Sequence, residues 1–554
     1  MVMTTISYSA LIAAIGKEVS LEELRVALFD LGMELKSRED DDLAIEIKAE
    51  RLDLLSLQGL ARALKSFLGL SPSYPQYAVH QSDYVVKISD SVKAVRPYTV
   101  CAIIKNLVVT DEILKEVINV QEKLHVTLAR GRVRGAIGIY PLENITLPIL
   151  YTAAKPQDIR FVPLGESQEM HGLQILQQTE TGKAYAHLLE GKDVFPYFVD
   201  ATGEVLSMPP IINSEKTGRV TENTRDLFIE CSGFEKKLLH ELLTNLVTMF
   251  ADMGGDIYSM RLVYEDGSVE QTPNLLPLQR TFRFSSFKKL IGIELSQEDI
   301  KSLLIKMMFE VVSIDGDVWS VRAPAFRADL WHEVDILDDI ARAYGYNNLP
   351  LTLPNVASIA SELPLSRLRE DLSEVMVGFG FLETYTFALT SIQDQLTNML
   401  INQEQLSFVP ISNGNETQNM LRVSLIPEQL KALANNRNRS LPQKIFEGAY
   451  VVLSDDSSDV KSTNMMHLTA LITDKIANFT QIRQILDALV LSCGKYVDVI
   501  PMSHPSFMEG RTGQVLLDGV PIGIIGELHP QVLVNFGLQT PVAAFEIKLK
   551  YLLD

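Results

Sequence analysis

Acidic side chains concentrate in one segment of the chain, RADLWHEVDILDDIARAYGY. The spacing of its apolar residues predicts a helix over residues 333–344. Asp335, Asp338 and Asp339 would then stand at positions i, i+3 and i+4, on one face of that helix. Asp329 lies just upstream, where it could turn its oxygens toward the same point. Four carboxylates are therefore expected close together.

Two interpretations of these carboxylates stay open. Like charges at such spacing repel by a few tenths of a kcal/mol per pair, so a compensating cation is one answer. Mg²⁺ prefers oxygen ligands and typically takes few from protein. The alternative is a solvated acidic face, because the helix dipole favours acids in a first turn. In either case Val334, Leu337 and Ala341 are expected to pack inward on the opposite side.

A second chemical region is LSMPPIINSEKTGRVTENTRDLFIEC. Its two prolines predict a rigid turn that projects Ser207, Asn213 and Ser214 reproducibly. Glu230 follows in an apolar strand, where a buried carboxylate without a partner would be costly. A bound polar group could supply that partner. The alternative is that Glu230 points outward from a one-sided strand and Asn213 caps a turn.

Two basic tracts interrupt a chain whose formal net charge is −20. In LARGRVRG, Arg130, Arg132 and Arg134 recur at period two, which predicts one face of a strand. The second tract is NNRNRSLPQK, residues 435–444. Either tract could meet RNA phosphates, but the prevailing acidity favours ordinary surface or subunit-interface charges.

Composition sets the class of protein. The 554 residues are 46% hydrophobic and 22% charged, which is typical of a globular protein and excludes wholesale disorder. Three scattered cysteines without a CxxC pair predict neither a disulfide framework nor a structural zinc site. No apolar run reaches the roughly 18 residues of a membrane span, and the first residues do not resemble a secretory signal. We therefore expect no membrane association and a cytoplasmic location.

The hydrophobic pattern and the Pro- and Ser-rich turns divide the chain into four stretches. The mixture of helices with alternating strands predicts an α+β multidomain fold. We expect a helix from Lys236 to about Met253 and another that Ser296 caps. The last stretch is expected to form an antiparallel sheet with helices on one side. The predicted boundaries are 1–85, closed by a linker SPSYPQY, then 86–270, 271–350 and 351–554.

Several strings together resemble one family. They are EIKAERLDLLSLQGLARAL, RGRVRGAIGIYPLENI, FVPL, VLSMPPIINSE, TRDLFIE, FRADLWHEVDILDDIARAYGYNNL and IGELHPQVLVNFGL. In this order they resemble the beta subunit of phenylalanyl-tRNA synthetase in its archaeal and eukaryotic form. The resemblance runs over nearly the whole chain.

The resemblance implies a fold for each stretch. Residues 1–85 would be an N-terminal α/β module and residues 86–270 an editing domain. Residues 271–350 would form a winged-helix-like domain that carries the acidic helix. Residues 351–554 would resemble a degenerate class II synthetase core, and they lack a GxGxxR-type nucleotide motif, so this chain should not adenylate an amino acid alone.

The resemblance also implies a function. The family enzyme is an (αβ)₂ heterotetramer that uses ATP and Mg²⁺ to attach phenylalanine to tRNA(Phe), with the aminoacylation site on the alpha subunit. Its magnesium positions, described as shared with the alpha subunit, are matched here by four aspartates. The sharing would explain an acidic cluster with no basic partner nearby in the sequence. The four residues are Asp329, Asp335, Asp338 and Asp339; the family usually has Glu in place of Asp338.

The family's editing pocket, which hydrolyses mischarged tyrosyl-tRNA, is matched by Phe198, Ser207, Asn213 and Glu230. Relatives often have Leu in place of Phe198 and Asp in place of Glu230. Tyrosine differs from phenylalanine by one hydroxyl, and an apolar pocket rejects an added hydroxyl only about 10²-fold. A second site that binds the hydroxyl through an amide or a carboxylate selects the error instead.

Two other functions stay open. The chain could be an inactive scaffold that only assembles and orients a catalytic partner and tRNA. It could also be an independent phosphoryl-transfer enzyme built on its carboxylates, but no Gly-rich phosphate loop accompanies them.

Overall fold

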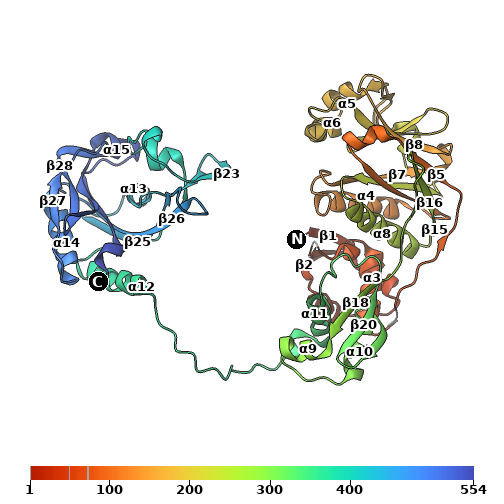
Figure 1. Ribbon diagram of the computed structural model, residues 1–554, viewed down its shortest axis with the longest axis horizontal. Coiled ribbons are helices and arrows are strands. Elements are labelled where there is room, and N and C mark those ends of the chain that lie inside the picture. Colours follow the sequence, from red (N-terminus) through yellow and green to blue (C-terminus); the bar gives the residue numbers. More distant parts are fainter. Residues whose placement is uncertain (1, 49, 71–73, 554) are drawn as a thin grey trace. The chain divides into compact units, whose positions relative to one another are not determined.

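The structure is a computed structural model that describes residues 2–48, 50–70 and 74–553. It divides into two compact units, Met1–Leu353 and Pro354–Asp554 (Figure 1). Both units combine helices with mainly antiparallel sheets, which confirms the predicted α+β multidomain class. Within the described residues, no helix combines the length and apolar character that a membrane crossing requires.

A three-stranded antiparallel sheet, in the order β1-β3-β2, and three helices form the N-terminal module. The elements are β1 (Val2–Ser7), α1 (Tyr8–Ile15), α2 (Leu21–Asp30), β2 (Glu34–Glu39), β3 (Asp42–Ile47) and α3 (Leu57–Phe67). Helix α2 begins where Ser20 and Glu23 form a capping box, as its SLEE string favours. Of the predicted linker, residues 71–73 lie outside the described residues, and residues 74–77 form neither helix nor strand.

Two sheets face each other in the next part of this unit. The five-stranded sheet has the order β4-β15-β6-β14-β7, and the seven-stranded sheet has the order β13-β12-β11-β8-β5-β16-β17. The strands of the first are β4 (Val79–His80), β6 (Tyr98–Lys105), β7 (Gly135–Pro141), β14 (Leu227–Gly233) and β15 (Asp256–Tyr258). Those of the second are β5 (Val85–Ile88), β8 (Ile149–Ala154), β11 (Phe195–Val199), β12 (Val205–Met208), β13 (Ile212–Asn213), β16 (Met260–Tyr264) and β17 (Val269–Thr272).

The two faces of the five-stranded sheet have different neighbours. One face packs on the seven-stranded sheet through aromatic residues such as Tyr140, Tyr151 and Phe228. The opposite face packs on helices α4 (Asp111–Val126) and α8 (Lys236–Asp252), and the latter confirms the helix predicted from Lys236. Shorter elements complete this part: β9 (Arg160–Phe161), β10 (Met170–His171), α5 (Gly172–Gln178), α6 (Glu180–Tyr185) and α7 (Glu215–Gly218).

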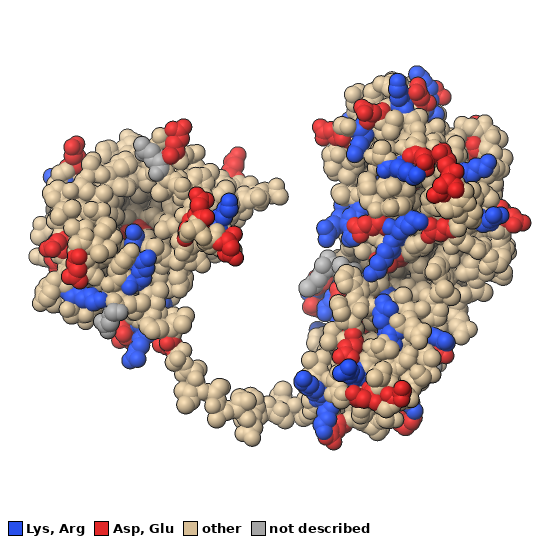
Figure 2. Space-filling model, viewed as in Figure 1, with Lys and Arg blue, Asp and Glu red and all other residues tan. Residues whose placement is uncertain are grey.

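The first basic tract is not a strand. Residues 127–133 form turns, and the backbone at Arg130, Gly131 and Arg132 is left-handed, with φ of 48°, 64° and 67°. Left-handed residues cannot continue a strand, so the prediction from the period-two arginines was wrong. In the second tract, Arg437 and Arg439 are exposed. On the face that Figure 2 shows, basic and acidic side chains intermingle over each unit.

A third module ends the first unit. Its antiparallel sheet has the order β18-β20-β19, and the acidic helix packs on it. The elements are β18 (Leu278–Arg283), α9 (Phe284–Ile291), α10 (Gln297–Lys306), β19 (Glu310–Asp315), β20 (Val318–Ala323) and α11 (Glu333–Tyr344). Helix α11 has the predicted bounds, and Ser296 caps α10 as predicted. One continuous apolar core joins this module to the N-terminal module and to α4 and α8.

The second unit is built on a seven-stranded sheet in the order β21-β25-β26-β30-β29-β28-β27. Its strands are β21 (Leu382–Glu383), β25 (Gln443–Ser454), β26 (Ser462–Thr473), β27 (Asp498–Pro501), β28 (Phe507–Leu517), β29 (Val520–Leu528) and β30 (Val542–Lys548). A small sheet joins β22 (Leu389–Thr390), β23 (Pro410–Asn415) and β24 (Gln418–Leu421). The helices are α12 (Pro364–Gly378), α13 (Ile426–Asn435), α14 (Phe479–Ser492) and α15 (Pro530–Asn535).

Helices cover both faces of this sheet, so the prediction of helices on one side was wrong. Leu468 and Ala470 of β26 pack with α12 and α14 on one face. Leu471 packs with α13 and α15 on the other face. Successive residues of a strand point to opposite faces, and the nearly continuous apolar run of β26 is typical of a strand covered on both.

The segment between the units, residues 350–363, has no helix or strand and is exposed throughout. Its apolar residues Leu351, Leu353 and Ile359 are at least 96% exposed. We predict that thermolysin, which cleaves before large apolar residues, makes its first cuts here, because proteases favour exposed backbone that is free of structure. Mass spectrometry should find two fragments that match the two units. First cuts inside either unit, for example in the β23–β24 turn, would contradict this division.

Candidate functional site

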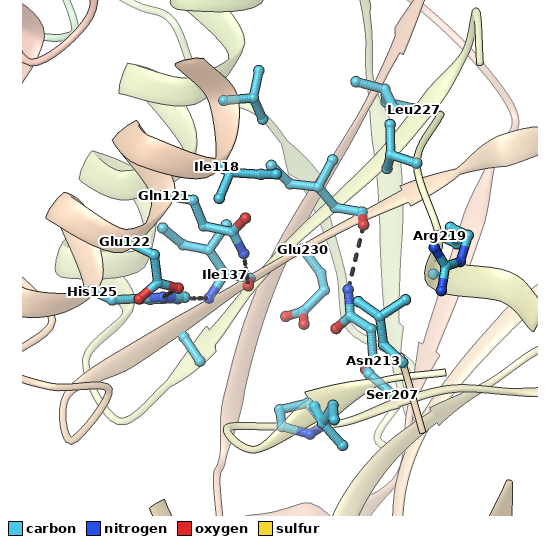
Figure 3. A pocket seen from close by; sticks show the side chains of 18 of the residues that line it. Ile118, Gln121, Glu122, His125, Ile137, Ser207, Asn213, Arg219, Leu227 and Glu230 are labelled. Carbon is cyan, nitrogen blue, oxygen red and sulfur yellow. Dashed lines mark hydrogen bonds and ion pairs between the residues drawn. The ribbon is translucent and has the colours of Figure 1, made fainter. Parts of the chain in front are cut away.

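A cavity of about 520 Å³ opens beside the five-stranded sheet, at strand β7. Its walls come from α4, β7, the turn between β12 and β13, and β14 (Figure 3). Most of the lining is apolar. The residues include Val117, Ile118, Ile137, Ile139, Pro209, Pro210 and Leu227. The polar lining includes Gln121, Glu122, His125, Arg132, Ser207, Asn213, Arg219 and Glu230.

The edges of the two sheets bring three of the predicted pocket residues to this cavity. Strand β7 is the edge of the five-stranded sheet, and β13 is the edge of the seven-stranded sheet. Ser207 and Asn213 face each other in the register of β12 with β13. Glu230 reaches the same cavity from β14, the neighbour of β7.

Two contacts hold the β12–β13 turn in place. The Leu164 N–H, in the FVPL string, donates to the Asn213 carbonyl at 2.9 Å. The Arg132 guanidinium donates to the carbonyls of Pro210 and Ile211 at 3.2 and 3.1 Å. Arg132 therefore fastens the turn to the end of α4, where it also pairs with a carboxylate.

Gly138 gives Glu230 its access to the edge of the sheet. The two residues are directly opposite in the register of β7 with β14. A Cβ at Gly138 would lie 2.6 Å from Glu230 Oε1 and would also collide with the Tyr140 hydroxyl. Because no real Cβ can approach so closely, the strand needs glycine at this position.

Glu230 is buried, with 2% of its surface exposed, so the alternative of an outward-facing Glu230 was wrong. The Tyr140 hydroxyl shares its one hydrogen between Ser207 Oγ, at 2.7 Å, and Glu230 Oε1, at 3.2 Å. Glu230 Oε2 has no hydrogen-bond partner among the described residues. Burial raises the pKa of Glu230 to about 7, although the charge of Arg96 and hydrogen bonds from Tyr140 and Ser232 oppose the rise.

Asn213 is half-buried, and its side-chain N–H donates to the Ile139 carbonyl at 3.4 Å. Gly218 packs against it so closely that a Cβ there would lie 2.7 Å from the Asn213 Cβ. Figure 3 shows Gln121, Glu230 and Asn213 across the cavity, with Glu122 and His125 beyond Gln121. The cavity thus combines apolar walls with a few amide and carboxyl groups, as small-molecule sites do.

Phe198 does not line the cavity. It is fully buried between the sheets, where its ring stacks on Tyr151 at a centroid distance of 4.4 Å and meets Phe228 edge-on. It lies opposite Ser207 in the register of β11 with β12. Phe198 therefore supports the site from behind, as the residue paired with Ser207 on the neighbouring strand.

The sequence did not point to Tyr140 or to the pair of His125 and Glu122. His125 Nε2 accepts the Ile137 N–H at 2.9 Å, and its Nδ1 lies 3.3 Å from Glu122 Oε1. Burial lowers the pKa of His125, so the ring stays neutral with both nitrogens engaged. His125 is therefore unsuited to act as a general base. The i, i+3 spacing of the pair in QEKLHV is the signal that could have found it.

The structure separates the four aspartates of the acidic segment. Arg327 donates to Asp329 at 2.8 and 2.7 Å and to Asp339 at 2.6 Å, inside a buried site. Asp335 Oδ2 accepts two backbone N–H groups at the start of α11. Asp338 pairs with one residue a turn further along α11 and with another just beyond the end of that helix. They are Arg342, at 2.8 Å, and the Tyr346 hydroxyl.

The residues present do not fit a single magnesium site. In the part of the chain that the structure describes, no group of three or more His, Cys, Asp or Glu side chains is placed to hold a metal ion. The interpretation that the acids lack a basic partner nearby in the sequence was wrong, because Arg327 precedes Asp329 by two residues. The inward face was also only partly right: Leu337 and Ala341 are buried, but Val334 is 47% exposed.

A second buried ion pair lies close to the first. Arg51 donates to Asp53 through two bonds of 2.9 Å, and both side chains are buried. Burial lowers the pKa of Arg51, but Asp53 and, more weakly, Asp329 raise it above its ordinary value. Burial raises the pKa of Asp329, but Arg327 and, more weakly, Arg51 lower it to about 2, so the two pairs interact. The EIKAERLDLLS and FRADLW strings are thereby joined across two modules.

Family models match three parts of the chain. They are described as the Phe-tRNA synthetase beta subunit B1 domain, residues 1–70, the tRNA synthetase B5 domain, residues 280–346, and the phenylalanyl tRNA synthetase beta chain CLM domain, residues 349–549.

Whole-chain relatives carry the same description. The chain is 39% identical over 542 residues to the phenylalanine–tRNA ligase beta subunit of Pyrococcus furiosus, covering 97% of both proteins. It is 38% identical over 526 residues to that of Archaeoglobus fulgidus, covering 95% of this chain and 94% of the relative. A crystal structure of an N-terminal fragment of the phenylalanyl-tRNA synthetase beta subunit from Pyrococcus horikoshii is similar with a TM-score of 0.60 and 38% identity. It covers 62% of this chain and all of the fragment.

We predict that the acidic segment is stabilised by Arg327 and not by a metal ion. Arg327→Met leaves Asp329 and Asp339 buried without their counter-ion, so it should lower the free energy of unfolding by about 3–5 kcal/mol. Arg322→Met removes an exposed pair with Glu310 in the same module and should cost less than about 1 kcal/mol. Chelation of divalent ions with EDTA should leave the Tm of the unsubstituted protein unchanged. If chelation lowered the Tm as much as Arg327→Met does, a bound metal ion would be what compensates the charge of these aspartates.

We also predict a pH-dependent effect of Glu230→Gln on stability. The folded carboxyl keeps its proton up to about pH 7, whereas the unfolded one loses it near its ordinary pKa of 4.5. Stability therefore falls as pH rises between these values, and an amide removes that loss. The gain in free energy of unfolding should be largest at pH 8, at most about 3 kcal/mol, and shrink toward pH 5. Denaturant unfolding at both pH values measures it.

The matched control is Glu204→Gln, at an exposed carboxylate paired with Lys216. It should change stability little at either pH. An equal effect of Glu230→Gln at pH 5 and pH 8 would mean that the buried carboxyl does not titrate in this range.

Proposed function

Because the chain belongs to the family of phenylalanine–tRNA ligase beta subunits, we propose that its cavity at Glu230 binds the tyrosyl group of mischarged tRNA and positions its ester for hydrolysis. The chain is one part of the ligase, and attachment of the amino acid occurs on the alpha subunit. The observation that carries the proposal is the buried Glu230, whose Oε2 has no hydrogen-bond partner among the described residues.

The chemistry of the cavity suits the one difference between tyrosine and phenylalanine. A buried acceptor without a donor costs about 1–3 kcal/mol, and a phenol hydroxyl that enters would supply the donor. Phenylalanine would leave Oε2 unpaired, so the cavity favours the wrong amino acid, as an editing site must. The apolar walls from α4 and β7 bury the rest of the ring.

The chain supports hydrolysis by position and not by a nucleophile. Both His125 nitrogens are engaged, so it neither attacks the ester nor takes a proton. Water adds to the carbonyl carbon, the bond to the ribose oxygen breaks, and that oxygen takes the proton. A neighbouring ribose hydroxyl of the substrate itself can pass the proton along. The part of this chain is to hold the tyrosyl group through Glu230 and Asn213 and to exclude bulk water.

The working enzyme would be an (αβ)₂ heterotetramer in the cytoplasm that binds tRNA(Phe), with phenylalanine and ATP at the alpha subunit. Magnesium would serve the ligase through the ATP there. If an ion is shared with this chain, Asp335 and Asp338 are its half-buried candidates, because Asp329 and Asp339 are committed to Arg327.

We predict that Asn213→Ala with Glu230→Ala abolishes editing in the enzyme assembled with its alpha subunit. Hydrolysis of tyrosyl-tRNA(Phe) should fall at least about 10²-fold, because the groups that read the hydroxyl are gone. Attachment of phenylalanine should be unchanged, since that reaction belongs to the alpha subunit. Release of labelled tyrosine and charging with labelled phenylalanine measure the two activities.

Glu204→Ala, in the same domain and exposed, is the control and should leave both activities intact. Normal clearance of tyrosyl-tRNA by the double variant would show that the pocket is elsewhere. An unsubstituted complex that charges phenylalanine but never clears tyrosyl-tRNA would favour the inactive scaffold.

A further inference from the structure

Arg96, on the loop before β6, is a buried cation without a counter-ion in direct contact. Its exposed fraction is 3%, and within the described residues no carboxylate lies within ion-pair distance of it. Its Nε donates to Ser232 Oγ at 3.2 Å, and its Nη2 donates to the Ser232 carbonyl at 2.7 Å. The guanidinium also lies over the Phe234 ring, 5.5 Å from the centroid.

Such a group needs a charge nearby, because a buried ion without compensation costs several kcal/mol. The available charge is Glu230. Ser232 follows Glu230 by two residues on β14, so both side chains point to the same face of the strand. Burial lowers the pKa of Arg96, and Tyr151 and the charge of Glu230 oppose that fall. Burial raises the pKa of Glu230, and the charge of Arg96 is the largest influence that opposes that rise. The Ser232 hydroxyl accepts from Arg96 and also lowers the pKa of Glu230, so it lies between the two groups.

The loop that carries Arg96 is held firmly. The Arg96 N–H donates to the Val92 carbonyl at 2.8 Å, and the Tyr151 hydroxyl donates to the Arg96 carbonyl at 2.8 Å. The Tyr151 ring stacks on Phe198, which gives this fully buried residue of the predicted pocket a place in the same arrangement.

Glu122, Arg132 and Arg219 line the same cavity, whereas the thiols and phenols packed around Glu230 within the sheets are neutral near pH 7. Cys101 of β6 lies opposite it in register, Tyr140 is on β7, Tyr151 is on β8, and Cys231 is its neighbour on β14. Burial raises the pKa of every one of these thiols and phenols. Among the described groups that act on the Glu230 charge, Arg96 is therefore the cation.

We propose that Arg96 is a positioning residue of the editing site, which acts through Ser232 to hold Glu230 charged and oriented for the tyrosyl hydroxyl. This inference rests on the proposed function. Arg96 would thus set the pH range in which the enzyme distinguishes tyrosyl from phenylalanyl groups. The reason is that Glu230 acts purely as a hydrogen-bond acceptor only when its carboxyl group is ionised.

The test is the pH profile of tyrosyl-tRNA(Phe) hydrolysis by the assembled enzyme, measured as kcat/KM from pH 5.5 to 9. The unsubstituted enzyme should rise to a plateau with a midpoint near 7. Arg96→Met should move the midpoint to higher pH by about one unit or more, since an opposite charge has been removed. Arg96→Lys should restore the midpoint and recover only part of the plateau, because Lys keeps the charge but not the two-bond fork.

A merely structural Arg96 would lower the plateau at every pH and leave the midpoint in place, which would overturn the proposal. Charging with phenylalanine and the Tm report whether each variant is folded. If Arg96→Met does not fold, Ser232→Ala keeps the cation and removes the bridge. It should move the midpoint in the same direction by a smaller amount, and an unmoved midpoint would again overturn the proposal.

A second measurement separates this inference from the proposed function. If the unsubstituted enzyme does not clear tyrosyl-tRNA at all, the editing function fails, and stability still reports on the pair. The Tm loss on Arg96→Met at pH 8 should then be smaller in a Glu230→Gln background, because the charge that Arg96 compensates is absent. Equal losses in both backgrounds would show that the two residues are not coupled.

Discussion

One buried carboxylate sets the requirements for the structure around the cavity. Glu230 lies in the core between two sheets, where a charge is costly unless hydrogen bonds and an opposite charge compensate it. Tyr140 supplies one hydrogen bond, Ser232 another, and Arg96 the distant positive charge. Gly138 leaves the space that the carboxylate occupies at the sheet edge. The residue type at each of these four positions is explained by what it does for Glu230.

A different interaction holds the modules of the first unit together. The buried pairs of Arg51 with Asp53 and of Arg327 with Asp329 and Asp339 lie where the N-terminal module meets the acidic helix. A buried ion network specifies one arrangement, because any shift leaves a charge unpaired. The continuous apolar core joins the same modules, and burial of that surface is the main favourable contribution to folding there.

Local patterns predicted local structure well. The periodicity of residues 333–344 gave α11 its observed bounds, and Ser296 was correctly placed at a helix start. The period-two arginines were misleading, because the left-handed backbone of Arg130 and Arg132 depends on how the chain leaves α4. The apolar run of β26 contained the information that both faces are covered, which alternation alone would not give.

The sequence alone did not show which side chains contact one another in the folded chain. The spacing of Asp335, Asp338 and Asp339 on one helix was right, but their separate partners depend on how the preceding loop turns back. The cost of burying Glu230 was also visible from its apolar strand. The direction in which it points was not, since strand alternation permits either face.

The arrangement at Glu230 also explains how one site can be both stable and selective. Tyr140 engages only Oε1, and full satisfaction of the carboxylate by the protein would have removed any reason to bind a hydroxyl. Complete absence of compensation would have kept the group protonated well above neutral pH. Arg96 and Ser232 act from the far side and leave the cavity side open. A carboxylate that is charged yet one hydrogen bond short is what a selective acceptor for a phenol requires, and the two conditions can be met together only when the compensating cation lies behind the group and the ligand in front.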